Sequence, residues 1–551
     1  MSQMSGGEAM ARALLANGVD TVFGIPGAQM YPLFDAFYRL PEFNTIVPRH
    51  EQGAAYMAFG YTKVTGKPSA FAVVPGPGIL NTAAAVCTIE GCCQPVIGLT
   101  GEAFSDFIGK GRGILHELRD QRGTMASIAK DALHIHDATQ TGSIMNEAFR
   151  VMNSDRPGPV IAQMAWDTMQ KEWDIEIGAG NAEVHKPEIN SDEIRAAAKL
   201  ITEAEKPMIM LGAGAMHAGD EVKRLAELLD APVTAFRSGR GIVAEDSELG
   251  ISSVAARELW DDTDLIIGIG SRMEMQYFRW SPYPNYKPKP TYGPKIVRIE
   301  IDQNQLDSLV ADAPVLADSA DGTNALFEEL VELGAKSNPA RRERITAAKT
   351  KARGLIEKVQ PQVGYWDTIR NVMPRDGVIV PEVSQMGFTS YFGLEVLEPR
   401  TYITEGFQGT LGFGFQTAVG AKVGAGDRPT ISVTGDGGFM FGVQELATAV
   451  KYNIGLVTLI FNNSAFGNVR RDQQNWYKGN LIGADLKNPD FVKMAESFGA
   501  AGYRVDSPKS LQPVLEQALA DNKPCLIDVQ METGSETSPW EFIMMANKSW
   551  D

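Results

Sequence analysis

The feature that most constrains this chain is the glycine-rich sequence Gly435–Gly438, which lies between two apolar segments. The first segment, Pro429–Thr434, predicts a strand, and Gly455–Phe461 predicts a second strand that ends at Asn462–Asn463. A helix is expected between them over Phe439–Tyr452. A strand, a turn, a helix and a strand in this order predict a βαβ unit, so the expected fold class is α/β with parallel strands.

This turn offers the groups that hold a diphosphate through a metal ion. Glycines let backbone N–H groups approach phosphate oxygens, and a helix that starts at the turn adds a favourable dipole. Mg²⁺ prefers hard oxygen ligands, usually a carboxylate together with phosphate oxygens. The predicted metal ligands are therefore the carboxylate of Asp436, the amide oxygen of Asn463 and the backbone carbonyl of Ala465. A tight turn with an N-capping aspartate is the alternative, which the spacing across the whole unit disfavours.

This spacing resembles the signature of thiamine-diphosphate enzymes, and the resemblance extends over nearly the whole chain. That family also needs a glutamate at the aminopyrimidine ring of the cofactor, and Glu51 within Val47–Ala55 matches it. Three further motifs are similar to those of acetolactate synthases and their relatives: Phe23–Gly27, Gly76–Asn81 and Gly409–Gly414. Several motifs in the same order indicate the acetolactate-synthase-like branch, whose members decarboxylate or join 2-oxo acids.

The resemblance implies catalytic roles for two residues at the cofactor. Glu51 would act on the pyrimidine ring so that the thiazolium C2 can lose its proton, and burial should raise the pKa of this carboxyl group. Leu411 stands where acetolactate synthases carry methionine and would be the apolar wedge under the bent cofactor, with ordinary core packing as the alternative. The other expected cofactor contacts are Pro26, Asn81, Ser384, Gln385, Gly409, Gly435, Asp436, Gly437, Gly438, Asn463, Phe466 and Gly467. For Asn81, capping of a helix N-terminus is an equal alternative.

The chain departs from acetolactate synthases where those enzymes select the acceptor substrate. Their Gln-Trp-Gln is absent, and the corresponding stretch Gly467–Gln473 is followed by Trp476. Leu115–Gln121 replaces their Phe-Gln-Glu and is similar to 2-hydroxyacyl-CoA lyases and cyclic-diketone hydrolases around Asp120-Gln121. The candidate substrate-site residues are Glu102, His116, Gln121, Arg470 and Trp476.

His116 is also a candidate catalytic residue. A histidine pKa near neutrality suits proton transfer to a bound intermediate, and an ordinary surface or core histidine is the equal alternative. Arg470 and Arg471 each offer a guanidinium that can bind a substrate carboxylate through two hydrogen bonds, and one of the two is expected to be a solvated charge.

Alternating strand and helix patterns divide the 551 residues into three α/β domains with parallel sheets flanked by helices. The resemblance identifies a pyrimidine-binding domain over 1–170, a central Rossmann-like domain over 190–345 and a domain that binds diphosphate and Mg²⁺ over 362–551. Gln170–Ser191 is predicted to be a linker, and Met1–Asp20 an amphipathic helix.

The central domain contains Gly212–Ala215 after an apolar strand, a weak signal for nucleotide binding. Acetolactate synthases hold a flavin in this domain, so FAD is a candidate cofactor. Their Met-His-Gly is replaced here by Ile251–Ser253, while Gly268–Arg272 partly matches their sequence. A purely structural domain and a domain that binds ADP are the alternatives.

Composition excludes several classes of partner. The net charge of −17, without a basic tract, argues against nucleic acid. The sequence has neither an apolar run of about eighteen residues nor a basic segment before an apolar one at its start, so no membrane span or signal peptide is expected. The four cysteines lack a metal-binding spacing and fit reduced thiols in a cytoplasmic protein.

The function expected from the sequence is C–C bond cleavage or formation on a 2-oxo acid or related dicarbonyl, dependent on thiamine diphosphate and Mg²⁺. One alternative is a lyase or hydrolase of 2-hydroxyacyl-CoA or 1,2-diketone substrates. Another is a non-catalytic subunit that binds the cofactor, against which intact Glu51, Asp436 and Asn463 count. The resemblance also implies a homodimer or homotetramer with active sites at the subunit interface.

Overall fold

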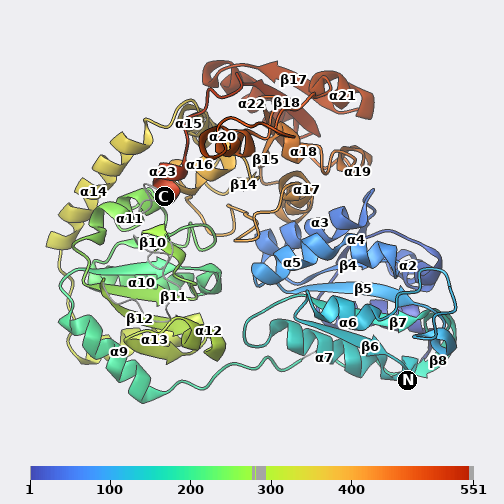
Figure 1. Cartoon of the computed structure of the whole chain (residues 1–551). Helices are drawn as coiled ribbons and strands as arrows, with labels where there is room; N and C mark the ends of the chain where they lie inside the picture. The colour runs from blue at the N-terminus through green and yellow to red at the C-terminus, as the bar shows by residue number, and fades with distance from the viewer. Residues whose placement is uncertain (1, 181, 276–278, 281–292, 545–551) are drawn as a thin grey trace.

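The computed structural model of this chain describes residues 2–180, 182–275, 279–280 and 293–544. It contains three parallel sheets, each flanked by helices, which confirms the predicted α/β class (Figure 1). The predicted end of the third domain, 545–551, and part of the predicted central domain lie outside the described residues. Within the described part of the chain, no helix is long and apolar enough to cross a membrane.

The N-terminal sheet has six strands. They are β2 (Thr21–Gly24), β3 (Asn44–Ile46), β4 (Ser69–Val73), β5 (Val96–Glu102), β6 (Asp131–Ile135) and β7 (Val160–Ala165). Their order is β3-β2-β4-β5-β7-β6, with every pairing parallel. Strands β4, β5 and β7 are buried along their whole length, as expected for parallel strands covered by helices on both faces. The helices are α1 (Gly6–Ala16), α2 (Tyr31–Arg39), α3 (Glu51–Thr65), α4 (Pro77–Asn81), α5 (Ala83–Gly91), α6 (Gln121–Ala126), α7 (Thr141–Asn153) and α8 (Trp166–Gln170).

Two predictions at the edges of this domain are wrong in part. The expected helix over Met1–Asp20 is shorter, because β1 (Ser2–Ser5) precedes α1 and Ser5 caps that helix by accepting from the Glu8 amide at 3.1 Å. The expected linker contains β8 (Glu172–Ile175), which pairs antiparallel with β1. The pairing buries apolar side chains of both strands. The sequence of either segment alone does not predict that the two strands pair.

The central sheet has five parallel strands in the order β10-β9-β11-β12-β13. They are β9 (Pro207–Leu211), β10 (Val233–Ala235), β11 (Leu265–Ile269), β12 (Lys295–Glu300) and β13 (Ala313–Leu316). The helices of this part are α9 (Ser191–Glu203), α10 (Gly219–Leu229), α11 (Ser253–Trp260), α12 (Gln303–Ser308) and α13 (Ser319–Glu332). Helix α14 (Ala340–Ile356) then runs along the outer edge of the molecule towards the C-terminal domain (Figure 1).

The C-terminal sheet also has five parallel strands, in the order β14-β15-β16-β18-β17. They are β14 (Val378–Pro381), β15 (Thr430–Gly435), β16 (Val457–Asn462), β17 (Ala501–Val505) and β18 (Cys525–Gln530). The helices are α15 (Gln362–Val372), α16 (Gln385–Gly393), α17 (Phe413–Ala425), α18 (Asp436–Phe439), α19 (Glu445–Lys451), α20 (Gly467–Trp476), α21 (Phe491–Phe498), α22 (Pro508–Asp521) and α23 (Trp540–Ile543).

The single helix predicted over Phe439–Tyr452 is wrong, because the structure has two short helices, α18 and α19. Helix α18 begins at Asp436, directly at the end of β15, and the chain turns after Phe439. The Phe439 ring packs edge-on against Phe415 and Phe491, at centroid distances of 5.0 and 5.8 Å. Burial of this ring between two other elements fixes the bend.

The N-terminal and C-terminal domains of one chain meet where α3 crosses α17. A Cβ on Gly60 would lie 2.1 Å from the Thr417 carbonyl oxygen, and one on Gly420 would lie 1.9 Å from the Met57 carbonyl oxygen. Only glycine permits so close an approach of two helix backbones. The two domains therefore form a tightly packed block.

Helix α3 is also held at its beginning by the C-terminal domain. The Glu445 carboxylate on α19 accepts from the backbone amides of Arg49 and His50, each at 3.0 Å. His50 caps the helix, since its Nδ1 accepts from the Gln52 amide at 3.1 Å. These contacts fix the place of Glu51, the first residue of α3.

Candidate functional site

Asp436 lies at the carboxyl end of β15, where ligands bind in open parallel sheets. Its side chain is buried, and its Oδ2 accepts from Asn488 Nδ2 at 2.6 Å. The same Asn488 nitrogen donates to Asn462 Oδ1 at 3.1 Å. One carboxylate oxygen of Asp436 is thus held by the protein, and the carboxylate has a fixed orientation.

The other two predicted metal ligands, Asn463 and Ala465, follow the neighbouring strand β16. Asn463 is buried, its Nδ2 donates to Glu536 Oε2 at 2.9 Å, and its Oδ1 accepts from the Ala465 amide at 3.1 Å. The Ala465 amide also lies close enough to the Asp436 carboxylate to lower the pKa of that group. The structure therefore brings all three predicted ligands together.

These residues fit a hard divalent cation. Burial raises the pKa of Asp436, and burial together with the nearby Asp436 raises the pKa of Glu536. Two carboxyl groups thus converge, and neither forms an ion pair with any of the residues that the structure describes. The ligands supplied are all oxygens, as Mg²⁺ requires. In the described part of the chain no group of three His, Cys, Asp or Glu side chains is arranged for a metal, which leaves this oxygen set as the candidate.

The residues predicted to contact the diphosphate surround the same turn. Ser384 caps α16 by accepting from the Gly387 amide at 3.0 Å, and its Cβ lies 3.4 Å from the position of a Cβ on Gly435. Gln385 is 7% exposed, and its Oε1 has no hydrogen-bond partner among the described residues. A Cβ on Gly467 would lie 3.8 Å from Gln385 Cγ. A buried amide without a partner is costly, so a polar ligand is expected here.

Phe466 closes one side of the glycine turn. A Cβ on Gly437 would lie 2.4 Å from the Phe466 ring, and one on Gly438 would lie 2.7 Å from Glu382 Oε1. Larger residues at either glycine would displace a ring or a buried carboxylate. The turn therefore keeps backbone amides accessible by packing its glycines against large neighbours.

Glu382 supports the predicted Gly409–Leu411 loop and was missed by the sequence analysis. It is buried directly after β14 and accepts from the Gly412 and Gly414 amides and, at 3.1 Å, from Thr434 Oγ1. Gly409 has a φ of +59°, and Leu411 is half-buried beside this anchor. The available signal was a carboxylate that directly follows an apolar strand, Val378–Pro381.

We expect Glu382 to make the stability of the apo protein pH-dependent. Burial raises its pKa from the ordinary 4.5 to about 7, against the lowering effect of the Gly412 amide, the Thr434 hydroxyl and the Gly414 amide. A group with a raised pKa stabilises the fold fully below the unfolded value and loses that contribution as the pH rises through the folded value. This shift corresponds to roughly 3 kcal/mol.

The free energy of unfolding in urea should therefore fall between pH 4.5 and 7 in the wild type. In Glu382→Gln this component of the decrease should be absent, because the amide does not titrate. Equal pH slopes in the two proteins would contradict the assignment.

The second half of the site lies on the N-terminal domain. The Glu51 Oε2 accepts from Asn81 Nδ2 at 3.0 Å, and the Glu51 Oε1 lies 3.7 Å from the position of a Cβ on Gly78. Asn81 is the last residue of α4, so it does not cap a helix N-terminus as the alternative required. Two residues predicted separately as cofactor contacts are in fact hydrogen-bonded to each other.

His116 lies beside Gly76, the residue that precedes α4. A Cβ on Gly76 would lie 2.4 Å from the His116 carbonyl oxygen, and His116 itself has a φ of +64°. Its Nδ1 lies 3.0 Å from Oε1 of the buried Gln29, whose Nε2 donates to the Leu115 carbonyl at 2.8 Å. Pro26 follows β2 and is exposed. His116 is thus oriented by Gln29 and is not a core histidine.

Gln121 and Glu102 belong to a buried polar network. The Gln121 Oε1 accepts from the Gly76 amide at 2.9 Å, and its Nε2 donates to the Gly101 carbonyl at 2.9 Å and to Gln163 Oε1 at 3.3 Å. Glu102 accepts from Gln163 Nε2 at 3.3 Å, and burial raises its pKa. All polar atoms of Gln121 are engaged, so it orders the turn at Gly76.

The arginines after the second motif are both paired. Arg470 Nε donates to Asp485 at 2.9 Å, and Arg471 donates to Asp472 at 2.7 Å and to Ser538 Oγ at 2.8 Å. Trp476 ends α20 and is exposed. Because each arginine is paired with an acidic neighbour, neither is well placed within one chain to bind a substrate carboxylate.

The two halves of the site are not connected directly within one chain. Across the described residues, no hydrogen bond or ion pair joins Glu51 or Asn81 to Asp436 or Asn463. Each half is ordered by its own neighbours. Each half carries the residues predicted for one end of the cofactor.

Comparisons with known proteins agree with this division. Family profiles of thiamine pyrophosphate enzymes match the chain as an N-terminal TPP binding domain over 4–124, a central domain over 194–326 and a C-terminal TPP binding domain over 383–529. A "probable acetolactate synthase large subunit" of Methanocaldococcus jannaschii is 33% identical over 96% of this chain and 92% of its own length.

Two further relatives carry different activities in their names. A "probable 2-ketoarginine decarboxylase" of Pseudomonas aeruginosa is 30% identical over 96% of this chain and 94% of its own length. An acetolactate synthase large subunit of Haemophilus influenzae is 27% identical over 98% of this chain and 97% of its own length.

The matched profiles include both half sites, with Glu51 and Asn81 in the first and Asp436 and Asn463 in the last. The relatives are similar over almost their full length, so the likeness is not confined to one domain. The cofactor supported by the profiles is thiamine diphosphate, and the relatives are enzymes of the transferase and lyase kind. The chain belongs to the thiamine-diphosphate-dependent enzyme family, in its acetolactate-synthase-like branch.

Proposed function

We propose that this enzyme uses thiamine diphosphate and Mg²⁺ to cleave or form the C–C bond beside the carbonyl of a 2-oxo acid. The observation that carries the proposal is the pair of ordered half sites, one around Glu51 and Asn81 and one around Asp436 and Asn463. The relatives' names support the same class, since one joins and another decarboxylates its substrate.

In this proposal Mg²⁺ is held by Asp436, Asn463 and the Ala465 carbonyl, and the diphosphate by the turn from Gly435 to Gly438 with Gln385. When bound, the cofactor would supply a nucleophilic carbon for reaction with the substrate carbonyl. Glu51 holds a proton at the pyrimidine ring, and Asn81 fixes the direction of its carboxylate.

His116 is the proposed group for proton transfer at the substrate. Its Nδ1 is directed by Gln29, and its Nε2 has no partner among the described residues. This arrangement leaves one ring nitrogen available for a proton. Leu411, beside the Glu382 anchor, is the proposed support of the bent cofactor.

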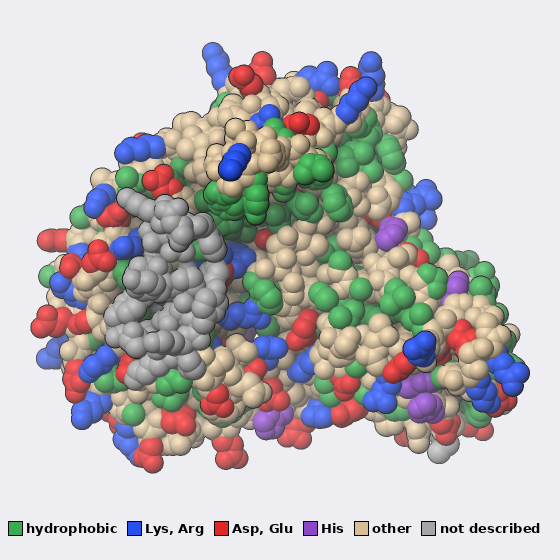
Figure 2. All heavy atoms as spheres, in the orientation of Figure 1, with side chains coloured by type: hydrophobic (Ala, Val, Ile, Leu, Met, Phe, Trp, Pro, Cys, Tyr) green, Lys and Arg blue, Asp and Glu red, His purple; other side chains and the backbone are tan. Residues whose placement is uncertain are grey.

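We also propose that two copies of the chain complete each site, as a homodimer or a homotetramer. Exposed apolar side chains lie beside both halves, namely Leu80 and Leu115 on one and Phe407 and Phe441 on the other. Figure 2 shows hydrophobic side chains gathered over the C-terminal domain on one face of the molecule. Such clusters mark protein interfaces more often than free surface.

Mixing of two inactive variants tests this arrangement. When Glu51→Gln and Asp436→Asn are co-expressed, activity should return, because each mixed dimer then holds one site with both residues intact. If one chain built the whole site, every site would carry a substitution and the mixture would remain inactive.

The substrate is tested by a panel read by mass spectrometry, with the cofactor and Mg²⁺ present. Acetolactate formed from pyruvate alone would support a carboligase, and carbon dioxide with an aldehyde from one 2-oxo acid would support a decarboxylase. Fission of 1,2-diketones or 2-hydroxyacyl-CoA without these products would favour the lyase or hydrolase alternative. Cofactor binding without turnover of any candidate would favour a non-catalytic subunit.

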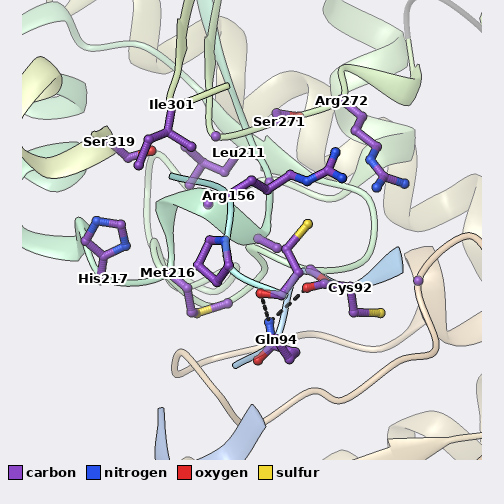
Figure 3. Close-up of a pocket in the computed structure, with 18 of the residues that line it drawn as sticks. Cys92, Gln94, Arg156, Leu211, Met216, His217, Ser271, Arg272, Ile301 and Ser319 are labelled. Atoms are coloured by element: carbon purple, nitrogen blue, oxygen red, sulfur yellow. Dashed lines mark hydrogen bonds between the residues drawn. The ribbon is translucent and has the colours of Figure 1, made fainter. Parts of the chain in front are cut away.

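A cavity of about 690 Å³ lies at the carboxyl ends of the central strands. Its walls include Leu211, Ser271 and Ile301, which end or follow β9, β11 and β12. Figure 3 shows Arg156 of the N-terminal domain near these strand ends, whereas Gln94 lies lower in the view, hydrogen-bonded to the Cys92 backbone. Open α/β sheets bind nucleotides at this position.

The charges of this cavity suit an adenine nucleotide. Arg272 lines it and can contact a diphosphate, whereas Arg156 and Lys186 also line it but are paired with Glu90 and Asp318. Buried Glu300 ends β12 and can accept from ribose hydroxyls. We propose FAD or ADP as the occupant. The purified protein tests this. Visible flavin absorbance would indicate FAD, and release of ADP into the supernatant after denaturation would indicate ADP. The absence of both would favour a structural domain.

A further inference from the structure

The C-terminal segment Met531–Trp540 lies against the loop that follows β16, and no motif in the sequence marks it. The Met531 amide donates to the Asn462 carbonyl at 2.9 Å, and Thr533 Oγ1 donates to the Asn463 carbonyl at 2.6 Å. Further along, Trp540 Nε1 donates to Asn468 Oδ1 at 2.7 Å. This segment, distant from β16 in sequence, thus binds the loop that carries two predicted metal ligands.

Glu536 is the one carboxylate that this segment places at a metal ligand. Its Oε2 accepts from Asn463 Nδ2 at 2.9 Å and lies 3.8 Å from the position of a Cβ on Gly467. The Asn463 Oδ1, at the other end of the same amide, accepts only from the Ala465 amide among the described residues. That oxygen keeps a second lone pair for another partner.

The orientation of this amide decides whether Asn463 can bind a metal. Only the oxygen of an asparagine amide is a ligand for a hard cation, and a flipped amide would present its NH₂ group instead. A hydrogen-bond acceptor that is fixed beside Asn463 Nδ2 favours the orientation in which Oδ1 can bind the metal. Asn488 acts in the same way on Asp436, since it occupies Oδ2 and leaves Oδ1 for another partner.

We propose that Glu536 is a positioning residue of the metal site, which holds the Asn463 amide with its oxygen towards Mg²⁺. This inference rests on the proposed Mg²⁺ site. Hydrogen-bond partners of metal ligands typically contribute about 10- to 100-fold to metal affinity. Glu536 accordingly couples the order of the C-terminal segment to the metal, although it lies 73 residues after Asn463 in sequence.

A direct metal ligand and a positioning residue differ in what they need from position 536. A carboxylate that bound Mg²⁺ directly would bind it more weakly once its charge is removed, whereas a positioning residue needs only an oxygen that accepts from Asn463. Glu536→Gln keeps such an oxygen and removes the charge, and Glu536→Ala removes both. Glu532→Gln is the matched control, because it neutralises an exposed carboxylate of the same segment.

The experiment measures Mg²⁺ affinity of the full-length apo enzyme at a fixed thiamine diphosphate concentration, by tryptophan fluorescence. Glu536→Ala should weaken Mg²⁺ binding by about 10- to 100-fold, while Glu536→Gln stays within a few-fold of the wild type and Glu532→Gln is unchanged. Wild-type affinity in Glu536→Ala would overturn the proposal. Equal loss in the alanine and glutamine variants would also overturn it, because the charge itself would then be required.

A double-mutant cycle separates positioning from general damage. If Glu536 acts through Asn463, the double variant Glu536→Ala/Asn463→Ala binds Mg²⁺ no more weakly than Asn463→Ala alone, and additive losses would contradict this. Should the alanine variant fail to fold, Glu536→Met gives the same comparison with a side chain of similar length. If the wild type binds the cofactor equally well with and without Mg²⁺, that result would instead refute the proposed function.

Discussion

Replacement of Glu51 by glutamine should slow the exchange of the C2 proton of bound thiamine diphosphate by about 10²- to 10⁴-fold, the usual contribution of a positioned acid or base. Glutamine keeps the size of the side chain and can still accept from Asn81, which lies 3.0 Å from the carboxylate. It cannot exchange a proton with the pyrimidine ring. The loss should therefore appear in proton exchange, while cofactor affinity changes little.

Hydrogen–deuterium exchange at C2, followed by NMR after acid quench, measures this directly. Glu42→Gln is a suitable control, since Glu42 is an exposed carboxylate of the same domain. Exchange at the wild-type rate in Glu51→Gln would refute the role of Glu51. If cofactor affinity falls by the same factor as the exchange rate, Glu51 has a role in binding in place of proton transfer.

Asp436→Asn should abolish the stabilisation of the protein by Mg²⁺ and thiamine diphosphate together. The variant replaces a buried carboxylate that forms no ion pair among the described residues. Its Mg²⁺ affinity should fall by more than about 100-fold, which exceeds the effect of a hydrogen-bond partner of a metal ligand. A ligand present at a hundred times its dissociation constant stabilises the folded state by about 2.7 kcal/mol, and this shift in Tm should vanish.

Folding and binding can be separated in the same measurement. Burial of Asp436 raises its pKa, which means that the charged form is disfavoured in the apo protein. The Tm of apo Asp436→Asn should therefore equal or exceed that of the wild type. Asp427→Asn, at an exposed site of the same domain, should keep the full ligand-induced shift. Normal Mg²⁺ binding by Asp436→Asn would refute the metal assignment.

The residues around the glycine turn could be predicted because they follow neighbouring parallel strands. Strand ends β15 and β16 lie side by side, so Asp436 and Asn463 must be close whatever the detail of the loops. Glu51 and Asn81 likewise follow strands of one sheet. The position of a short motif at the end of a strand is therefore fixed by the pairing of that strand in the sheet.

Supporting residues could not be predicted in this way. Glu382, Asn488 and Glu536 act through hydrogen bonds with segments that are distant in sequence. Of the three, only Glu382 offers a sequence signal, as a carboxylate directly after an apolar strand. The split of the helix after Asp436 depends on the packing of Phe439 between two other elements. Contacts of this kind depend on the tertiary fold, which local periodicity does not encode.

The close crossing of α3 and α17 has a consequence for communication between active sites. Each chain joins its Glu51 and Asp436 halves through backbone contacts at Gly60 and Gly420, which leave no room for sliding. In the proposed dimer these halves serve different sites. We therefore expect movement at one site to be transmitted to the other through the contact between α3 and α17.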